Sequence, residues 1–272
     1  MKPPFPTSPE LEVAILAAQS AGEIIGSYFR KDFQTNTKNH AGGTEGLVTQ
    51  ADIAAEQAII RIIQEAFPDH AIMAEESAQS PNHSEHLWVV DPLDGTNNFA
   101  HGIPHFAVSI AYCYQGQPIC GVVHDPVRND WFVAEQGRGA WHNRKQVQVN
   151  SQHSLDETMV AVGFYYDRDE MMRTTLSAIG DFFGQGIHGI RRMGAAALDI
   201  IHVGTGQYGV YFEYTLSPWD FAAAWIFLLE AGGQITDGQG NELSLKRSSV
   251  LATNGSLFQQ ALPIVLGNHP PV

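Results

Sequence analysis

The stretch of sequence that decides the fold is WVVDPLDGT, residues 88–96. Its apolar beginning predicts a buried strand. Pro92 then fixes one backbone angle and Gly95 permits a conformation that other residues resist, so Asp91 and Asp94 can point the same way from a tight turn. Converging carboxylates with a backbone carbonyl between them suit Mg²⁺. Taken alone, Asp91 and Asp94 are also typical of a plain Asx-type turn, and for the pair by itself that simpler interpretation is preferred.

One class of phosphatases, of the haloacid dehalogenase type, has aspartates after a strand in the pattern Asp-x-Asp-Gly-Thr, with a first Asp that becomes phosphorylated. In residues 91–96 the aspartates lie three positions apart rather than two. With this spacing, the second aspartate would not occupy the position that the partner of the nucleophile has in that class. We therefore interpret the likeness as accidental.

The sequence before this stretch predicts two helices. The first covers residues 9–30, with Ser8 as N-cap and Pro9 at the first helical position. The second covers residues 50–66, where Thr49 and Asp52 resemble the two ends of a capping box. Residues 34–46 between them are polar and glycine-containing, which predicts a mobile loop.

The sequence after this stretch predicts an antiparallel meander over residues 106–114, 119–124 and 131–135, separated by Gly and Pro turns. Beyond about residue 150, strands and helices alternate, which is typical of an α/β half. We therefore predict residues 1–150 as an N-terminal part of helices and antiparallel sheet, and residues 151–272 as a C-terminal α/β half. The predicted segments of that half are strands at 159–163 and 208–214 and helices at 169–183, 194–203 and 218–231.

The composition limits the classes of partner. The 272 residues include 29 Asp and Glu against 15 Lys and Arg, a net charge of −14. Such a surface repels nucleic acid and anionic membranes, so we expect neither as a partner. It also repels phosphorylated substrates, so a phosphate site would need bound cations. The N-terminus lacks an apolar stretch suited to a signal peptide, and we expect a cytoplasmic protein.

Two cysteines, Cys113 and Cys120, flank a turn predicted at residues 115–118. That turn could place them opposite each other on paired strands and allow a disulfide. Two reduced, packed thiols are the preferred interpretation for a cytoplasmic chain.

Two further acidic sites strengthen the metal hypothesis. Glu75 and Glu76 are adjacent, and paired carboxylates repel each other unless a cation or solvent separates them. Asp220 falls in the first turn of a helix capped by Ser217. An exposed acidic loop and a favourable helix-dipole interaction are the simpler explanations of the two sites.

Taken together, these residues resemble the inositol monophosphatase family of metal-dependent, lithium-sensitive sugar phosphatases. The resemblance extends from about Glu12 to Gly255, and it implies the family's layered αβαβα sandwich, an α/β (α+β) fold shared with fructose-1,6-bisphosphatase, as a homodimer. Four blocks match in order, at residues 47–52, 74–77, 88–99 and 218–224, with support from residues 194–197 and 230–233.

The resemblance also implies roles for individual residues. Glu75, Asp91 and the Leu93 carbonyl would hold a first Mg²⁺, Asp91, Asp94 and Asp220 a second, and a third would bind loosely near Glu75, with Mn²⁺ able to substitute. Asp52 and Thr96 would orient and help deprotonate the attacking water, and Glu75 joins them as a catalytic residue. Direct attack by water, with no phosphoenzyme, is the family's chemistry. The residues that would face the substrate are Asp94, Gly95, Thr96, Gly194, Ala195, Ala196, Glu213 and Asp220.

The expected substrate is a small phosphorylated polyol, with inositol 1-phosphate preferred, because a carboxylate such as Glu213 can accept two hydroxyl hydrogen bonds. Histidinol phosphate, fructose 1,6-bisphosphate, 3′-phosphoadenosine 5′-phosphate and NADP stay open as alternatives. The low count of Lys and Arg argues mildly against the bisphosphates. A regulatory, RNA- or transcription-associated binding protein is the alternative of another class.

The sequence departs from the family pattern near residue 46, where Gly46 stands in place of a common Asp and Lys38 cannot be aligned with the family's loop lysine. Both differences weaken the case for a third metal. The bulky side chains at residues 164–166 narrow the pocket or pack in the core. Arg191 is a dimer contact in one interpretation and a solvated cation in the other.

Overall fold

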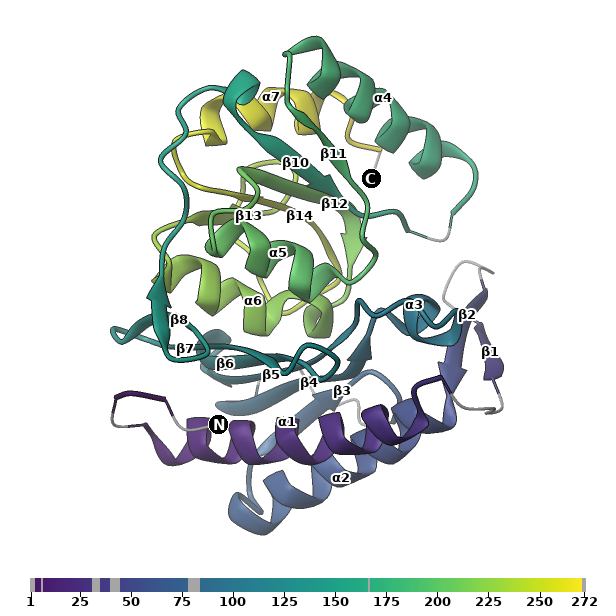
Figure 1. The fold of residues 1–272 in the computed structure, drawn as a ribbon, viewed down its shortest axis with the longest axis vertical. Coiled ribbons are helices and arrows are strands. Elements are labelled where there is room, and N and C mark those ends of the chain that lie inside the picture. The colour runs from purple at the N-terminus through teal and green to yellow at the C-terminus, as the bar shows by residue number, and fades with distance from the viewer. Residues whose placement is uncertain are drawn as a thin grey trace.

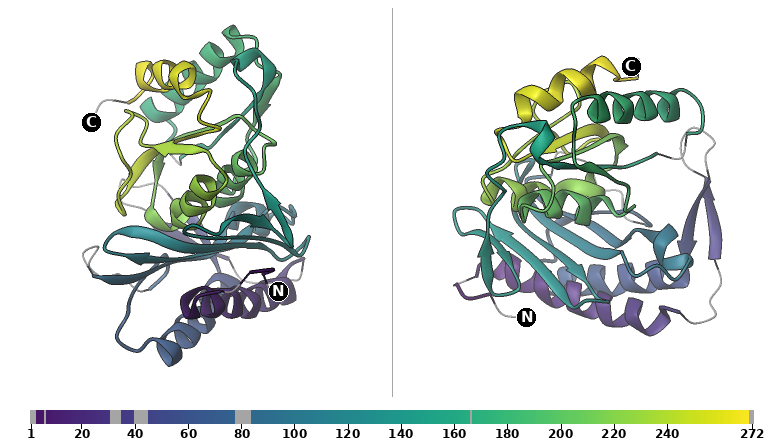
Figure 2. Two further views of the ribbon diagram at one scale, coloured as in Figure 1. Left: turned by 90° about the vertical axis from the view of Figure 1, so that its left-hand side faces the viewer. Right: turned by 45° about the horizontal axis from the view of Figure 1, so that its top comes forward.

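The computed structural model describes residues 3–5, 7–30, 35–39, 45–77, 84–165 and 167–270, with the side chains of 35–39 and 45–48 left aside. These residues form five layers, in which helices and sheets alternate (Figures 1 and 2). The outermost layers are helical, and a further layer of helices separates a seven-stranded sheet from a five-stranded sheet. The layered αβαβα sandwich expected from the sequence is thereby confirmed.

The large sheet has the strand order β3-β4-β5-β6-β7-β8-β9. From β4 onward each strand pairs antiparallel with the next, as the meander predicts, whereas β3 pairs parallel to β4. The sequence did not predict β3, β8 or β9. The strands are β3 (Ala71–Ala74), β4 (His86–Asp94), β5 (Ala107–Tyr114), β6 (Gln117–Asp125), β7 (Asp130–Glu135), β8 (Gly139–His142) and β9 (Lys145–Val147).

Helices α1 (Pro9–Tyr28) and α2 (Gln50–Ala66) cover the outer face of this sheet. Ser8 accepts a hydrogen bond from the Leu11 N–H, and Thr49 and Asp52 form the reciprocal capping box. Both helix starts are as predicted, because N-caps are local signals that the sequence states directly.

The small sheet has the order β11-β10-β12-β14-β13, with β10 parallel to both of its neighbours. The sequence did not predict β11, β13, β14 or the final helix. The strands are β10 (Met159–Val162), β11 (Gly189–Arg191), β12 (Val210–Leu216), β13 (Gln234–Thr236) and β14 (Ser248–Thr253). The remaining helices are α3 (Thr96–Ala100), the 3₁₀ turn η1 (Leu155–Glu157), α4 (Glu170–Gly184), α5 (Ala196–Gly204), α6 (Pro218–Glu230) and α7 (Phe258–Gly267).

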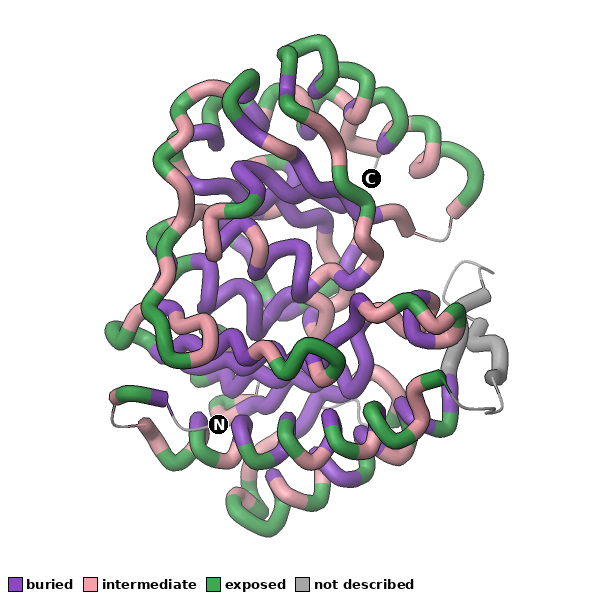
Figure 3. The backbone as a smooth tube through the Cα atoms, in the orientation of Figure 1, coloured by how far each residue is buried: buried purple, intermediate pink, exposed green. Residues whose placement is uncertain are grey.

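Helices α5 and α6 lie between the sheets and share one apolar cluster with both of them. Val89 of β4, Phe227 of α6 and Ala252 of β14 are all buried in that cluster. The burial is continuous through the middle of the molecule (Figure 3). The sandwiched helices therefore join the sheets through a common core, and the division at about residue 150 stays a prediction.

The structure corrects the predicted loop at residues 34–46. Strands β1 (Thr35–Asn39) and β2 (Glu45–Thr49) pair antiparallel as a separate two-stranded sheet. The stretches are polar, without the apolar alternation by which a half-buried strand is recognised. Backbone pairing thus decides the structure where the side-chain pattern does not.

The two cysteines are buried and free. A register shift in the β5–β6 pairing places Cys120 opposite Tyr112 and Cys113 opposite Pro118. Cys113 packs between the sheets, whereas Cys120 packs on the side of α1 and α2. The disulfide alternative is therefore wrong, and the preferred interpretation of two packed thiols is confirmed.

Among the residues that the structure describes, no helix combines the length and the apolarity that crossing a bilayer requires.

Candidate active site

A cavity of about 600 Å³ opens between the end of β4, the start of α5 and the small sheet. All but one of the predicted site residues line it. Asp52 is the exception, since its side chain is fully buried behind the cavity wall. The predicted residues at the wall are Glu75, Asp91, Leu93, Asp94, Gly95, Thr96, Gly194, Ala195, Ala196, Glu213 and Asp220.

A β-bulge explains how Asp91 and Asp94 both reach the cavity. Asp91 pairs with Ser109 and Asp94 with Ala107, so three steps along β4 match two along β5. Residues three apart on a regular strand face opposite sides, and the extra residue restores a common side. The Leu93 N–H donates to Asp91 Oδ1 at 2.9 Å and so tightens the turn. The bulge supplies the convergence that the sequence analysis attributed to Pro92 and Gly95.

Gly95 ends the bulge with a φ of +93°, where a side chain is strained. An added Cβ would lie 3.1 Å from the His105 carbonyl and 3.2 Å from Ala195. Gly95 therefore permits both the turn and the close approach of the segment before α5.

Asp52 and Thr96 form the predicted pair. Thr96 Oγ lies 3.1 Å from Asp52 Oδ1 and 3.0 Å from the Leu93 carbonyl, and it donates to these acceptors. Asp52 Oδ2 also accepts from the Thr49 N–H at 2.9 Å and from the Thr49 hydroxyl. With its proton directed at Asp52, the Thr96 oxygen presents lone pairs to the cavity, where it can accept a hydrogen bond from water.

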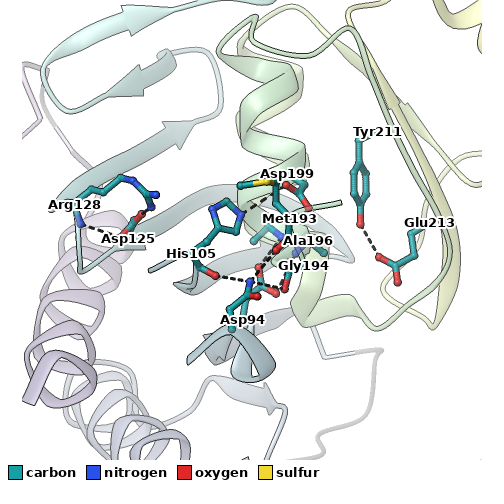
Figure 4. A network of polar contacts seen from close by, with 12 residues as sticks. Asp94, His105, Asp125, Arg128, Met193, Gly194, Ala196, Asp199, Tyr211 and Glu213 are labelled. Atoms are coloured by element: carbon teal, nitrogen blue, oxygen red, sulfur yellow. Dashed lines mark hydrogen bonds and ion pairs between the residues drawn. The ribbon is translucent and has the colours of Figure 1, made fainter. Parts of the chain in front are cut away.

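Asp94 connects the large sheet to the start of α5. Its Oδ1 accepts from the Ala196 N–H at 3.1 Å and its Oδ2 from the Ala197 N–H at 2.8 Å (Figure 4). These are the unpaired first N–H groups of the helix, which favour an anion. Burial nevertheless raises the pKa of Asp94 to about 8. One carboxylate thus fixes the start of α5, and with it segment 194–196, relative to β4.

Glu75 and Asp220 bring two more carboxylates to the same cavity. Burial raises the pKa of Asp91 well above its usual range, and the charges of Glu75, Asp94 and Asp220 raise it further. Burial likewise raises the pKa of Asp220, again with Glu75 and Asp94 adding to the effect. The Ser217 N–H donates to Asp220 Oδ2 at 2.6 Å, in the capping box at the start of α6. The four residues, hereafter the acidic group, therefore act on one another electrostatically.

The acidic group has the chemistry of a magnesium site. Within the described ranges, no three His, Cys, Asp or Glu side chains come close enough to enclose a metal ion by themselves. Mg²⁺ seldom needs such a cage, because it is usually held by one or two carboxylates together with waters and substrate phosphate. Hard oxygen donors that repel one another, as the raised pKa values of Asp91 and Asp220 indicate, fit such a divalent cation, whose charge would offset the repulsion.

Glu213 lies at the small-sheet side of the cavity, where it is 8% exposed. The Tyr211 hydroxyl donates to its Oε2 at 2.7 Å (Figure 4). Burial raises the pKa of Glu213 to about 7. Gly163 lies against it, since a Cβ there would stand 1.7 Å from Oε2. The carboxylate is thus fixed between a phenol and a bare backbone, with its remaining lone pairs available to a ligand.

Two residues that hold the site together, Asn98 and Glu56, are not predicted from the sequence. Asn98 Nδ2 donates to the His105 and Met193 carbonyls, each at 2.8 Å, and so ties α3 to the segment before Gly194. Glu56 of α2 accepts from the Glu76 N–H at 2.7 Å and orders the loop that carries Glu75. Asn98 falls inside a matched block, so its position was a usable signal, whereas no local pattern marks Glu56.

Three cations at the cavity were also missed, namely Arg192, Lys246 and Arg247. Asp199 lines the cavity as well, with Oδ1 3.8 Å from Nε2 of the buried His105 (Figure 4). Phe164 and Tyr165 form part of the wall, and Phe164 also packs against an apolar cluster of the small sheet. The side chain of Lys38, and Tyr166, fall outside what the structure describes.

Comparison with known proteins completes the description of the site. The profile of the Inositol monophosphatase family matches residues 7–266. The Nus factor SuhB of Pseudomonas aeruginosa is 40% identical over 97% of this chain and 98% of its own. The inositol-1-monophosphatase of Synechocystis is 40% identical over 92% of this chain and 86% of its own.

Solved structures agree with the sequence matches. The inositol monophosphatase of Anabaena superposes with a TM-score of 0.83 at 36% identity over 97% of both chains. An IMPase/NADP phosphatase complexed with Mg²⁺ and phosphate superposes with a TM-score of 0.81 at 26% identity, over 94% of this chain and 93% of its own. The likeness thus covers the whole cavity and both sheets.

Proposed function

The chain belongs to the inositol monophosphatase family, and on that premise we propose that it is a magnesium-dependent phosphate monoester hydrolase with inositol 1-phosphate as its preferred substrate. One observation carries the proposal: the buried Asp52 holds Thr96 at a cavity that the acidic group also lines. This combination provides for a cation and for a directed water in one place.

The residues proposed to hold the metal are those of the acidic group and the Leu93 carbonyl. Glu75, Asp91 and Leu93 would hold one ion, and Asp91, Asp94 and Asp220 a second. Bound there, Mg²⁺ would screen the phosphate charge, lower the pKa of water and stabilise the leaving oxygen. A related phosphatase crystallised with Mg²⁺ and phosphate supports this assignment.

Thr96 and Asp52 are proposed to direct the water. The Thr96 hydroxyl donates to Asp52, and its oxygen then accepts a hydrogen bond from water in the cavity. Asp52 keeps its place because Thr49 donates to its other oxygen from both backbone and side chain. The pair therefore fixes one orientation of the water relative to a phosphate bound beside Gly95.

The polyol would lie toward Glu213, Gly194, Ala195 and Ala196. Glu213 has lone pairs for substrate hydroxyls in addition to its bond from Tyr211. The Synechocystis relative named inositol-1-monophosphatase supports inositol 1-phosphate over the other esters.

The test is phosphate release from inositol 1-phosphate by the purified protein with Mg²⁺ and with EDTA. We expect turnover only with Mg²⁺. Thr96→Ala should lower kcat by roughly 10²-fold, as for loss of a general acid–base group, and Thr96→Ser should restore most of it. If folded protein releases no phosphate from this ester, histidinol phosphate, fructose 1,6-bisphosphate, 3′-phosphoadenosine 5′-phosphate or NADP, the proposal fails.

A second candidate is a regulatory binding role, for which the one supporting observation is the name Nus factor given to the Pseudomonas relative. The net charge of −14 argues against direct contact with RNA. Asp94→Asn separates the two candidates, because a protein that only binds a partner should keep its cellular role in this variant while phosphate release is lost.

A further inference from the structure

Asp199, a buried carboxylate at the cavity, and the buried His105 beside it have no part in the proposed chemistry. We infer that these two side chains are positioning residues, which together hold segment 194–196 in the orientation that the polyol requires. The inference rests on the proposed function, because it assumes that the polyol contacts this segment. It adds two residues to the machinery that selects the substrate.

The two side chains face each other without a regular hydrogen bond. Asp199 is 1% exposed and His105 is 4% exposed. Among the residues that the structure describes, neither carboxylate oxygen of Asp199 has a hydrogen-bond partner, and Nε2 of His105 has none either. Nε2 lies 3.8 Å from Oδ1 (Figure 4), which is within ion-pair distance and too long for a hydrogen bond. Each group is thus the partner that the other lacks.

This arrangement is unfavourable for stability, which points to a functional reason for it. Buried polar atoms nearly always have a partner, and two apolar side chains of the same shape would cost less at this place. Departures of this kind are typical of functional sites. A metal ion does not explain the pair, because no three His, Cys, Asp or Glu side chains in the described ranges come close enough to hold one.

The pair connects the same parts of the fold as Asp94 does. Asp199 lies in the first turn of α5, and His105 lies two residues before β5 of the large sheet. Asp94, at the end of the neighbouring strand β4, accepts from the amides of Ala196 and Ala197. The large sheet therefore contacts the start of α5 at two carboxylates, one from β4 and one from the helix itself.

Asp199 also acts on Gly194, at the other end of segment 194–196. Burial raises the pKa of Asp199, whereas His105 and the Gly194 N–H lower it. The Gly194 amide is therefore directed toward the carboxylate, although the contact is longer than a regular hydrogen bond. With its proton on Nε2, His105 stabilises the ionised form of Asp199, which attracts that amide more strongly than the neutral form.

The two carboxylates thus divide the segment between them. Asp94 holds its end at Ala196, and the His105–Asp199 pair holds its beginning at Gly194. Loss of the pair should free Gly194 while β4 and the acidic group keep their places. Contacts to the polyol should then weaken, and contacts to the phosphate should not.

The test compares two histidines near the start of α5. His105→Phe keeps a ring but removes the donor, and His105→Gln restores an N–H that can point at Asp199. The matched control is His202→Phe. The ring of His202 lies 6.2 Å from that of His105 and also has a buried, unpaired nitrogen, but His202 does not line the cavity.

We expect His105→Phe to raise KM for inositol 1-phosphate roughly fivefold, as for loss of one hydrogen bond, with kcat within twofold. The inhibition constant of inorganic phosphate should stay within twofold. His105→Gln should recover most of the loss, and His202→Phe should change none of the three constants. An equal rise of KM in His202→Phe, an equal weakening of inorganic phosphate, or an unchanged KM in His105→Phe would overturn the inference.

A double variant keeps the test decisive if a single variant does not fold. His105→Phe/Asp199→Leu leaves neither group without its partner, so we expect it to be folded. Its KM should rise no more than that of either folded single variant, because the two side chains act as a unit. Additive rises, or an unchanged KM in the double variant, would contradict the inference.

Failure of the proposed function is separately visible. If the wild type releases no phosphate from inositol 1-phosphate, calorimetric binding of this ester in the same Mg²⁺ buffer decides the inference alone. Weaker binding by His105→Phe than by His202→Phe would uphold it. Equal binding by the two variants, or no binding by the wild type, would refute it.

Discussion

The two sides of the cavity differ in how the chain builds them. The β4 side takes Asp91, Asp94 and Thr96 from six consecutive residues, and a bulge and a left-handed glycine fix their directions. The small-sheet side gathers Gly163, Tyr165, Glu213, Lys246 and Arg247 from three separate segments. We infer that the first side serves the reaction, which is common to the family, and that the second serves the choice of substrate.

The difference teaches where each kind of residue can change. A turn that converges two carboxylates tolerates few substitutions, because its geometry is local and tight. Side chains contributed singly from separate segments can be exchanged one at a time. Experiments that measure turnover and substrate preference separately can therefore test whether the two sides of the cavity have different roles.

The largest effect is expected from Asp91→Asn on the β4 side. Turnover with Mg²⁺ should fall on the order of 10³-fold, because a carboxylate shared by the proposed metals is lost. In EDTA the variant should be more stable to urea than the wild type, since one buried, mutually repelling charge is removed. Phosphate release and urea unfolding measure the two effects.

The control is Asp69→Asn, which changes an exposed aspartate in the turn before β3. It should alter neither measurement. If Asp91→Asn retained more than a tenth of wild-type turnover, the β4 side would not be the reactive side.

A smaller effect is expected from Glu213→Gln on the small-sheet side. Burial raises the pKa of Glu213 from 4.5 to about 7, so the folded state keeps a proton that the unfolded state has released. The contribution of Glu213 to the free energy of unfolding is therefore fully present below pH 4.5. It is lost as the pH rises from 4.5 to 7. At pH 8 in EDTA the variant should be more stable by about 2–3 kcal/mol.

Urea unfolding at pH 5 and pH 8 checks this, with the exposed Glu242→Gln as the control. The stability gap between Glu213→Gln and the wild type should open as the pH rises. A gap that is the same at both pH values would show that Glu213 titrates normally.

The smallest effect is expected from Asn98→Ala, which removes the link between α3 and the Met193 carbonyl. The free energy of unfolding should fall by about 1–2 kcal/mol, because the buried His105 carbonyl and the partly buried Met193 carbonyl lose a donor. KM for inositol 1-phosphate should rise a few-fold while kcat changes little, since segment 194–196 loosens and β4 does not. Steady-state kinetics separates the two constants, and a fall in kcat alone would contradict the assignment.

The sequence predicted what is local. The capping box of α2, the helix start at Ser217 with Asp220 in its first turn, and the strand before Asp91 depend on neighbouring residues, and each is predicted correctly. The polar strands β1 and β2 were missed because no apolar alternation marks them. The β5–β6 register that separates Cys113 from Cys120 depends on a shift that the turn residues do not state.

The candidate site shows the same difference between local features, which the sequence predicts, and contacts between distant residues, which it does not. The Asp52–Thr96 pair joins residues 44 positions apart, and in the sequence only the family resemblance links them. The hydrogen bond from Asn98 to the Met193 carbonyl joins residues 95 positions apart. No sequence pattern predicts the cation–π contact between Arg247 and Tyr165. Such contacts depend on how the two sheets pack, which single-sequence patterns do not encode.

The attachment of Asp94 to the first turn of α5 has a practical consequence. The amides of Ala196 and Ala197 donate to a carboxylate at the cavity, so their solvent exchange and their nitrogen resonances should respond when the charge on that carboxylate is drawn toward a ligand. These two amides at the start of α5 would then report spectroscopically whether a ligand occupies the cavity. A titration could be followed there without a coupled assay or a chromogenic ester.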